Sequence, residues 1–359
     1  MGSSSGSRPD SDSERSWRSK EYPQLDLNYG ALRHIANYYL PGGHGKCKFI
    51  DKVGRGTYHE IRLLGFDDGW TCIGRFTRDL QESVTIAESE IATREHVRKH
   101  TTIPVPETYY INLDPTNAVG APFVLMEHIE GHTLADMWPA LKTDYRLAVL
   151  SDIAKVIAPL ARLRFNAIGS LKMGGVVAIR EEITRFCDAR EGNEILSAPY
   201  RLLHGDFDSQ NMLFIWENPA TPPRLSGIID WDFSRTAPPY NLCEYPRFIL
   251  DNDTEIGLYR ENQLLRKEFV RMLAQNFPKH SHERELVREC FRYKTFALNG
   301  FQSVFATGTW AEKFEKMLVR DYLRQLQNLR EGRKSLPPYN GGDDSPELDS
   351  ELESNDEDA

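Results

Sequence analysis

The sequence has few cysteines, no long apolar run and no surplus of basic residues. Its 359 residues include five cysteines, widely spaced, with no Cys-x-x-Cys pair and no histidine at a spacing typical of zinc sites. No apolar run approaches the roughly 20 residues that a transmembrane helix needs. These absences argue against a disulfide scaffold, a zinc module and a membrane-spanning protein. We therefore expect a cytoplasmic protein whose thiols are reduced.

The net charge of −9 arises at one end of the chain. Residues 343–359 hold nine Asp and Glu and no Lys or Arg, so the rest of the chain carries 44 acids against 44 bases. A balanced body lacks the basic surplus with which proteins neutralise nucleic-acid phosphates. We expect neither a nucleic-acid partner nor a membrane partner, and the sequence does not indicate an oligomeric state.

The pattern of residue types changes along the chain and divides it into four parts. Residues 1–24 are Ser-rich and charged, which predicts a disordered leader, and residues 333–359 form an acidic tail that we also expect to be disordered. Residues 25–130 predict a strand-rich N-lobe, and residues 131–332 a larger, mainly helical C-lobe. The 40% hydrophobic content is sufficient for a full core.

The N-lobe consists of short runs rich in β-branched and aromatic residues, most of them bounded by Gly, Pro or Asp-Gly signals. One segment, "LQESVTIAESEIATREHVRKH", instead has the composition of a helix. The order predicted is three strands, a helix and two strands. The stretch "FDDGW" predicts a tight hairpin turn between the second and third strands.

The C-lobe begins with a helical pattern, in which leucines and isoleucines between residues 147 and 163 recur at three- and four-residue spacing. Similar segments at roughly 254–276, 281–300 and 310–331 predict further helices. Between them "NMLFIW" and "LSGIID" predict a short β-hairpin. The fold class expected is therefore α+β.

The hairpin carries the residues that indicate chemistry. His204, Gly205 and Asp206 are followed by four residues and then by Asn211, which opens the first strand. The second strand ends in Asp230, nineteen residues after Asn211. This is the spacing of a kinase catalytic loop, Asp-x-x-x-x-Asn, followed by a metal-binding Asp.

Phosphoryl transfer fits this set because its catalysis consists mostly of positioning and charge neutralisation. One carboxylate has to accept or orient the proton of the acceptor hydroxyl. Other oxygens have to hold Mg²⁺, which prefers hard ligands such as Asp and the Asn carbonyl. A loop Asp, a strand-initiating Asn and an Asp at the end of the partner strand deliver all three to one point.

"HGDFDSQNMLF" and "IIDWDFS" resemble the aminoglycoside phosphotransferase and choline kinase family, especially its fungal branch. The segments "ESEIATREHVRKHTTIPVP" and "GAPFVLMEHIEGHTL" are similar to that branch's αC helix and inter-lobe linker. The resemblance covers roughly residues 48–250 and implies a two-lobed, protein-kinase-like fold. It also implies an ATP- and Mg²⁺-dependent phosphotransferase that acts on a hydroxyl group of a small molecule.

Carried over residue by residue, the resemblance makes Asp206 the catalytic base and makes Asn211 and Asp230 the metal ligands. His204 and Gly205 are interpreted as residues that shape the loop. Two further carboxylates of the motif, Asp208 and Asp232, have no assignment, and a solvent-facing and a substrate-contacting role stay open for each.

The N-lobe departs from the family pattern at the strand "TCIGRF", where Arg75 stands in place of the phosphate-binding Lys. Arginine also binds phosphate oxygens, although the two residues are not interchangeable. We expect Arg75 to contact the α- and β-phosphates and to pair with Glu90 of the following helix, with Glu88 as the second choice. A surface ion pair is the alternative interpretation.

Two other segments are candidates for nucleotide contacts. "VGRGTY" supplies Gly54 and Gly56, whose loop could cover phosphates through backbone N–H groups, although an ordinary hairpin turn has the same pattern. The linker "LMEHI" supplies backbone groups from Glu127 to Ile129 that could hydrogen-bond adenine.

Two alternatives remain open at the level of sequence. An apolar strand ending in Asp-x-Asp also occurs in haloacid-dehalogenase-type phosphatases and in glycosyltransferases that bind a metal. A nucleotide-binding pseudokinase would keep the fold without turnover, and Arg75 is the main support for that alternative. The sequence does not indicate which molecule accepts the phosphoryl group, and the family name does not imply aminoglycoside resistance.

Overall fold

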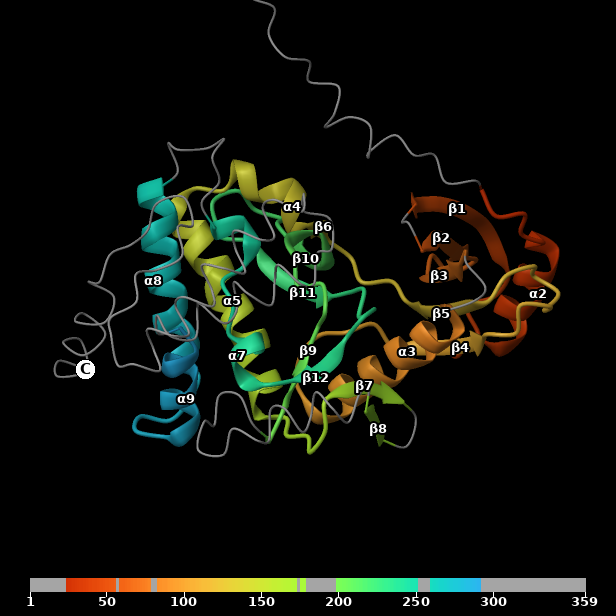
Figure 1. The fold of residues 1–359 in the computed structure, drawn as a ribbon. Coiled ribbons are helices and arrows are strands. Elements are labelled where there is room, and N and C mark those ends of the chain that lie inside the picture. The colour runs from red at the N-terminus through yellow and green to blue at the C-terminus, as the bar shows by residue number, and fades with distance from the viewer. Residues whose placement is uncertain are drawn as a thin grey trace, which may run out of the picture. The chain divides into compact units, whose positions relative to one another are not determined.

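The computed structural model describes residues 24–55, 58–78, 83–172, 175–178, 198–250 and 259–291. The chain divides into two compact units, whose elements are drawn in Figure 1. Unit 1 comprises the described residues up to Val84 together with Thr108–His128, and unit 2 comprises Thr85–Glu107 and the described residues from Ile129 onward. The expected leader up to residue 23, the acidic tail and the helix expected at 310–331 lie outside the described residues.

Unit 1 is built on a five-stranded antiparallel sheet with the order β1-β2-β3-β5-β4. Three strands, then a helix, then two strands follow one another along the chain, as the sequence predicts. The strands are β1 (Cys47–Arg55), β2 (His59–Phe66), β3 (Thr71–Thr77), β4 (Thr108–Asn112) and β5 (Phe123–Glu127).

The predicted turn in "FDDGW" joins β2 to β3. Phe66 N–H donates to the Trp70 carbonyl at 3.0 Å and Gly69 N–H donates to the Phe66 carbonyl at 3.1 Å. Gly69 has a φ of 87°, which a residue with a side chain adopts at a cost. The turn holds the two strands in continuous register from His59 opposite Thr77 to Gly65 opposite Thr71.

A helix that the sequence analysis did not predict, α2 (Tyr29–Tyr39), precedes the sheet. The side chain of Asn28 caps its start by accepting a hydrogen bond from Ala31 N–H at 3.1 Å. Leu32 of α2 is fully buried in one cluster with Leu64 and Phe123 of the sheet. The core of unit 1 therefore lies between α2 and the sheet.

The helix α3 (Ser83–His100) groups with unit 2 from Thr85 onward. Ala92 and Val97 belong to the hydrophobic core of unit 2, as do Ile103 and Val105 of the segment that follows. The Ile228 N–H donates to the carbonyl of Pro104 at 2.9 Å, which ties that segment to the strand ending near Asp230.

In unit 2, α5 carries the apolar stripe read from the sequence and contacts α7 and α8. Leu150, Ile153, Ile157 and Leu160 are all buried, and α5 packs against α8. The described helices are α4 (Leu134–Met137), α5 (Thr143–Arg162), α7 (Pro239–Leu242), α8 (Tyr259–Gln275) and α9 (His282–Phe291).

Two small sheets complete unit 2. The order β11-β10-β6 contains the predicted hairpin, and the order β8-β7-β12-β9 consists of short strands that the sequence analysis did not predict. Their bounds are β6 (His132–Thr133), β7 (Gly169–Lys172), β8 (Gly175–Ala178), β9 (Arg201–Leu203), β10 (Met212–Ile215), β11 (Arg224–Ile228) and β12 (Arg235–Ala237).

The α+β class is confirmed by this combination of an antiparallel N-terminal sheet and later helices. Among the described residues, no helix combines the length and apolar character required to cross a membrane.

Candidate functional site

The predicted catalytic loop connects β9 to β10 and depends on Gly205. This residue has a φ of 84°. A Cβ at this position would lie 2.5 Å from the Phe233 carbonyl oxygen and 2.9 Å from that of Asp232. Only glycine therefore allows the start of the loop to approach the backbone that follows β11 so closely.

His204 is an internal support of the loop. Its side chain is buried, with 3% of its surface exposed, and its Nε2 lies 3.0 Å from the Ile229 carbonyl oxygen, to which it donates. Its ring packs against Trp231 at 4.5 Å between centroids. Burial lowers the pKa of His204 to about 4, so the ring is neutral at pH 7. The structural interpretation of His204 is confirmed.

Asp206 and Asn211 are in direct contact. Asn211 Nδ2 donates to the Asp206 carboxylate at 3.0 Å and to the Asp206 backbone oxygen at 2.9 Å. Gln210 Nε2 donates to the same carboxylate oxygen at 3.1 Å. These contacts fix the orientation of the predicted base, while Asp206 itself stays half-buried.

Asp208 acquires a structural role. It precedes the 3₁₀ turn η2 (Ser209–Asn211), and its side chain accepts a hydrogen bond from Ser209 N–H at 2.7 Å. Its backbone oxygen accepts a hydrogen bond from Asn211 N–H at 2.9 Å. Asp208 therefore holds the turn that delivers Asn211 to the start of β10.

The hairpin places Asp230 beside Asn211. Met212 pairs with Ile228 across β10 and β11, and Ile229 N–H donates to the Asn211 carbonyl at 3.0 Å. Asp230 is the next residue, exposed and with a φ of 60°. A left-handed conformation at a residue other than glycine is uncommon and is found often at functional sites.

Asn211 and Asp230 suit Mg²⁺ better than a metal that requires a full protein cage. Asn211 is buried, its amide nitrogen is used by Asp206, and no described residue donates to its amide oxygen. In the described parts of the chain, His, Cys, Asp and Glu side chains form no group of three able to hold a metal. Two protein oxygens nevertheless fit Mg²⁺, which keeps several waters and binds phosphate oxygens.

The turn after Asp230 is locked by residues that the sequence analysis left unassigned or did not name. Trp231 is fully buried and its Nε1 donates to the Ile228 carbonyl at 3.1 Å. The Ser234 hydroxyl lies 2.6 Å from the Trp231 oxygen and 2.8 Å from the His204 oxygen. Asp232 is buried, with 4% of its surface exposed, so it does not face solvent.

The candidate phosphate-binding residues lie in different units. Arg75 is buried in the central strand β3, opposite Ile61 and Val124. Glu90 is buried in the part of α3 that belongs to unit 2, and it forms an ion pair with Arg94 at 2.5 Å. The contact predicted between Arg75 and Glu90 stays a prediction. Glu88, the second choice, is exposed.

The other nucleotide candidates are placed as follows. Gly54 lies in β1 opposite Ile61, whereas Gly56 lies outside the described residues. Glu127 ends β5 and is half-buried. Ile129 begins the next part of unit 2, and its side chain lies so near Gly227 of β11 that a Cβ there would meet it at 2.5 Å.

A pocket of about 130 Å³ is lined in part by residues 204–208 of the loop and contains further functional candidates that local sequence patterns do not mark. Arg235, Glu244 and Arg247 contribute charged groups to its wall. Glu244 reaches solvent but is surrounded by protein, and this desolvation raises its pKa to about 7 against the lowering effect of the two arginines. No pattern in the sequence marks these residues, since they follow the motif at irregular spacing.

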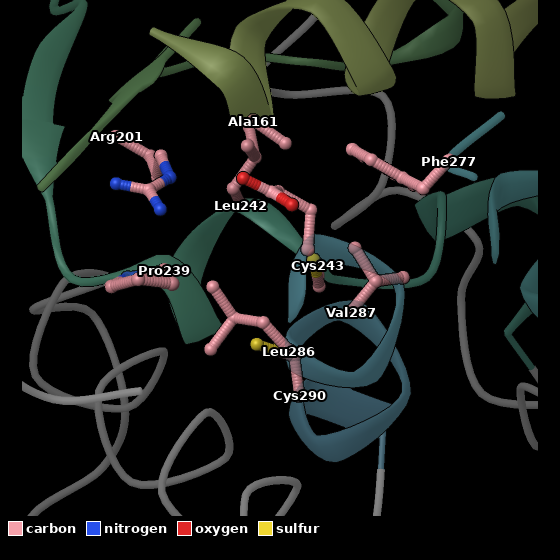
Figure 2. A pocket seen from close by; sticks show the side chains of 10 residues that line it. Ala161, Arg201, Pro239, Leu242, Cys243, Phe277, Leu286, Val287 and Cys290 are labelled. Atoms are coloured by element: carbon pink, nitrogen blue, oxygen red, sulfur yellow. The ribbon is translucent and has the colours of Figure 1, made fainter. Parts of the chain in front are cut away.

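A second pocket, shown in Figure 2, lies between α5, α7 and α9. Its volume is about 10 Å³, which is at most the space of one water molecule. A hydrogen bond that the Cys290 thiol donates to Cys243 and burial together raise the pKa of the Cys290 thiol well above its usual range. We interpret this pocket as a packing feature.

Comparison with known proteins identifies the segment that carries the loop. Residues 176–241 match the model of the phosphotransferase enzyme family. This segment belongs to that family. The matched stretch includes both motifs described above, so the resemblance to the aminoglycoside phosphotransferases is confirmed there.

The curated proteins to which this chain is similar include fungal proteins. It is 31% identical over 126 residues to a subtelomeric hrmA-associated cluster protein of Aspergillus fumigatus, covering 35% of this chain and 25% of that protein. It is 30% identical over 163 residues to the altered inheritance of mitochondria protein 9, mitochondrial, of Kluyveromyces lactis, covering 42% and 26%. The chain thus spans about a quarter of the length of these curated relatives.

Among solved structures, the streptomycin-ATP-APH(2")-IIa ternary complex matches with a TM-score of 0.47 and 13% sequence identity. The match covers 84% of this chain and 97% of that chain.

Proposed function

We propose that the protein is an ATP- and Mg²⁺-dependent kinase that phosphorylates a hydroxyl group of a small molecule. The observation that carries the proposal is the hydrogen bond between Asn211 and the Asp206 carboxylate. Ile229, which is bonded to the Asn211 carbonyl, is followed directly by Asp230. Membership of residues 176–241 in a phosphotransferase family supports it. We place the protein in the cytoplasm as part of this proposal.

In the proposed reaction Asp206 accepts the proton of the acceptor hydroxyl. The hydroxyl oxygen forms a bond to the γ-phosphorus of ATP, the bond from that phosphorus to the bridging oxygen breaks, and ADP leaves with the electron pair. Asp206 then releases its proton to solvent. Bound through Asn211 and Asp230, Mg²⁺ would neutralise phosphate charge.

This chain's own residues keep the base in position. Asn211 and Gln210 each donate to the Asp206 carboxylate, and the buried, neutral His204 holds the loop to the strand end at Ile229. Arg75, Glu90, Gly54, Gly56, Glu127 and Ile129 remain the proposed nucleotide contacts.

The test is Mg²⁺-dependent ADP formation with a panel of hydroxylated metabolites. We expect Asp206→Asn to lower turnover about 10²- to 10⁴-fold, the range of a lost general base, while nucleotide binding persists. Asp144→Asn, at an exposed position on α5, is the matched control and should behave as wild type.

The pseudokinase alternative rests on Arg75 in place of lysine. Nucleotide binding without turnover on any acceptor would support that alternative. Phosphatase activity that is lost in Asp230→Ala, together with no nucleotide binding, would overturn the kinase proposal.

A further inference from the structure

The lining of the pocket beside Asp206 combines apolar and charged side chains. Ile157 and Leu160 of α5, Leu203 of β9 and the ring of Phe207 supply apolar surface, and Asp206 lies in the same lining. Such a wall suits a short carbon chain whose hydroxyl reaches the base.

The arginines of the pocket are held in place by their backbones. Arg235 lies in β12 opposite Leu203, the residue just before His204. Arg247 begins the 3₁₀ turn η3 (Arg247–Ile249), where Ile249 N–H donates to the Pro246 carbonyl at 3.0 Å. Both guanidinium groups therefore start from fixed points of the pocket wall.

Neither arginine forms a direct ion pair with a carboxylate among the described residues, although both lie near enough to Glu244 to interact with its charge. Arg235 makes one long contact, 3.5 Å to the Phe233 backbone oxygen, and Arg247 makes no side-chain hydrogen bond within the described part of the chain. A guanidinium in a pocket gains most from a carboxylate, which it binds through two parallel hydrogen bonds.

The acids of the pocket lining form no direct ion pair with these arginines among the described residues. Asp206 accepts hydrogen bonds from Asn211 and Gln210, and Asp208 accepts one from Ser209. Glu244 has a pKa of about 7 and is partly protonated at neutral pH. Because neither guanidinium group forms a direct ion pair, both can bind a ligand that enters the pocket.

The volume of the pocket limits the size of the acceptor. About 130 Å³ is well below the roughly 300–1,000 Å³ typical of sites for drug-sized ligands. A small molecule of a few carbons fits this volume, whereas a polycationic aminoglycoside suits neither its size nor its arginines.

From this geometry, and resting on the proposed kinase function, we infer that the acceptor is a small alcohol that carries a carboxylate. Arg235 and Arg247 bind the carboxylate, the apolar wall contacts the carbon chain, and the hydroxyl lies at Asp206. A simple hydroxy acid and a hydroxy amino acid share this chemistry.

A matched set of four-carbon alcohols distinguishes the sources: gamma-hydroxybutyrate, homoserine, aminobutanol and butanediol. We expect Mg²⁺-dependent ADP formation with one or both carboxylates and little with the amine or the diol. Preference for homoserine that is lost in Glu244→Gln would identify the hydroxy amino acid, and turnover of gamma-hydroxybutyrate would identify the hydroxy acid.

Variants test the arginines. Arg247→Gln or Arg235→Gln should raise KM for the carboxylate substrate about 10- to 100-fold, since a charge-assisted hydrogen bond contributes roughly 1.5–3 kcal/mol. Arg260→Gln, at an exposed position on α8 outside the pocket lining, is the matched control and should leave KM unchanged.

Binding is measured in parallel by calorimetry with gamma-hydroxybutyrate and homoserine, so that the inference is tested even without turnover. Carboxylate binding that is lost in both arginine variants supports it. Turnover of the amine or the diol in preference to the carboxylates overturns it and leaves the kinase proposal intact. Carboxylate binding without any turnover supports the pocket assignment and contradicts the kinase proposal, and no carboxylate binding at all overturns the inference.

Discussion

Glu60 in unit 1 and Glu244 in unit 2 are both glutamates near two arginines, but only one of them is bonded. Glu60 is fully buried, and its carboxylate accepts hydrogen bonds from Arg62, from Arg78 at 3.0 Å and from Leu25 N–H at 3.2 Å. Glu244 makes no direct hydrogen bond among the described residues and reaches solvent through the pocket.

The difference separates structural charges from charges that are available to a ligand. A buried carboxylate with all its oxygens occupied can only hold the fold together. A pocket in which acids and guanidinium groups form no direct ion pair retains its capacity to bind another molecule.

The largest expected effect comes from neutralising these two acids in turn. Glu60→Gln leaves Arg62 and Arg78 buried without their counter-charge, and we expect a loss of about 3–5 kcal/mol in the free energy of unfolding. Glu244→Gln removes no direct contact and should change it by about 0.5 kcal/mol or less. Urea denaturation of both variants measures the difference.

The exposed ion pair between Arg98 and Glu107 provides the control for Glu60. Both side chains are more than 40% exposed, so Glu107→Gln should cost less than about 1 kcal/mol. Equal losses of unfolding free energy in Glu60→Gln and Glu107→Gln would contradict the distinction between buried and exposed charges.

A second comparison between the units uses two glycines with almost the same backbone. Gly69 has a φ of 87° and a Cβ added there would have nothing within 4 Å, whereas Gly205 has a φ of 84° and a Cβ added there would meet a carbonyl oxygen at 2.5 Å. Alanine at either position incurs about 1–2 kcal/mol of backbone strain. Gly205→Ala should lose about 1–3 kcal/mol more, because its methyl group overpacks the loop.

Thermal unfolding of Gly69→Ala and Gly205→Ala measures this difference. If both variants lose the same stability, the close approach of the loop at Gly205 to Phe233 does not constrain that loop.

The sequence predicted the parts of the site that depend on local spacing. Asp206 and Asn211 are five residues apart and meet within one turn, and Asp230 follows because the hairpin pairs Met212 with Ile228. The apolar stripe of α5 was likewise readable, since its period is that of a helix.

The sequence could not predict features that depend on contacts between distant segments. Arg235 reaches the loop because β12 pairs with β9, a contact between strands of three residues each. Helix α3 was counted in the N-lobe, but the side chains of Ala92 and Val97 pack in the core of unit 2. No local sequence pattern indicates which distant strand a strand pairs with or which core a helix joins.

The pH dependence of the free energy of unfolding distinguishes His204 from Glu244, the solvent-exposed acid of the same unit. The pKa of His204 is about 4 in the folded protein against 6.5 in the unfolded chain. Between these two pH values the unfolded state therefore binds more protons than the folded state. Its contribution is fully present above about pH 6.5 and is lost as pH falls toward 4. We expect the free energy of unfolding to fall by about 1 kcal/mol between about pH 7.5 and 5.5 because of this group.

Unfolding at both pH values in wild type and His204→Gln isolates that contribution, because glutamine can still donate to the Ile229 carbonyl. His34→Gln, at an exposed position on α2, is the control and should keep the wild-type pH dependence. The same pH dependence in His204→Gln as in wild type would show that the loop does not seal His204 from water.

Glu244 should have a pH dependence of opposite sign and smaller size. Its pKa is raised from 4.5 to about 7 by desolvation, so the folded state holds the proton more tightly and stability falls as pH rises from about 4.5 to 7. Replacing it with glutamine removes this fall, so Glu244→Gln should gain stability relative to wild type at about pH 8 compared with about pH 5. Because the residue reaches solvent, the gain should be smaller than the His204 effect.

The same glutamate reports on whether a ligand occupies the pocket. A carboxylate bound at Arg247 and Arg235 would be repelled by ionised Glu244 and should therefore raise the pKa of Glu244 further. Titration of Glu244 with and without gamma-hydroxybutyrate measures this change. If the pKa of Glu244 does not change on binding, the carboxylate of the ligand does not lie beside Glu244 at Arg235 and Arg247.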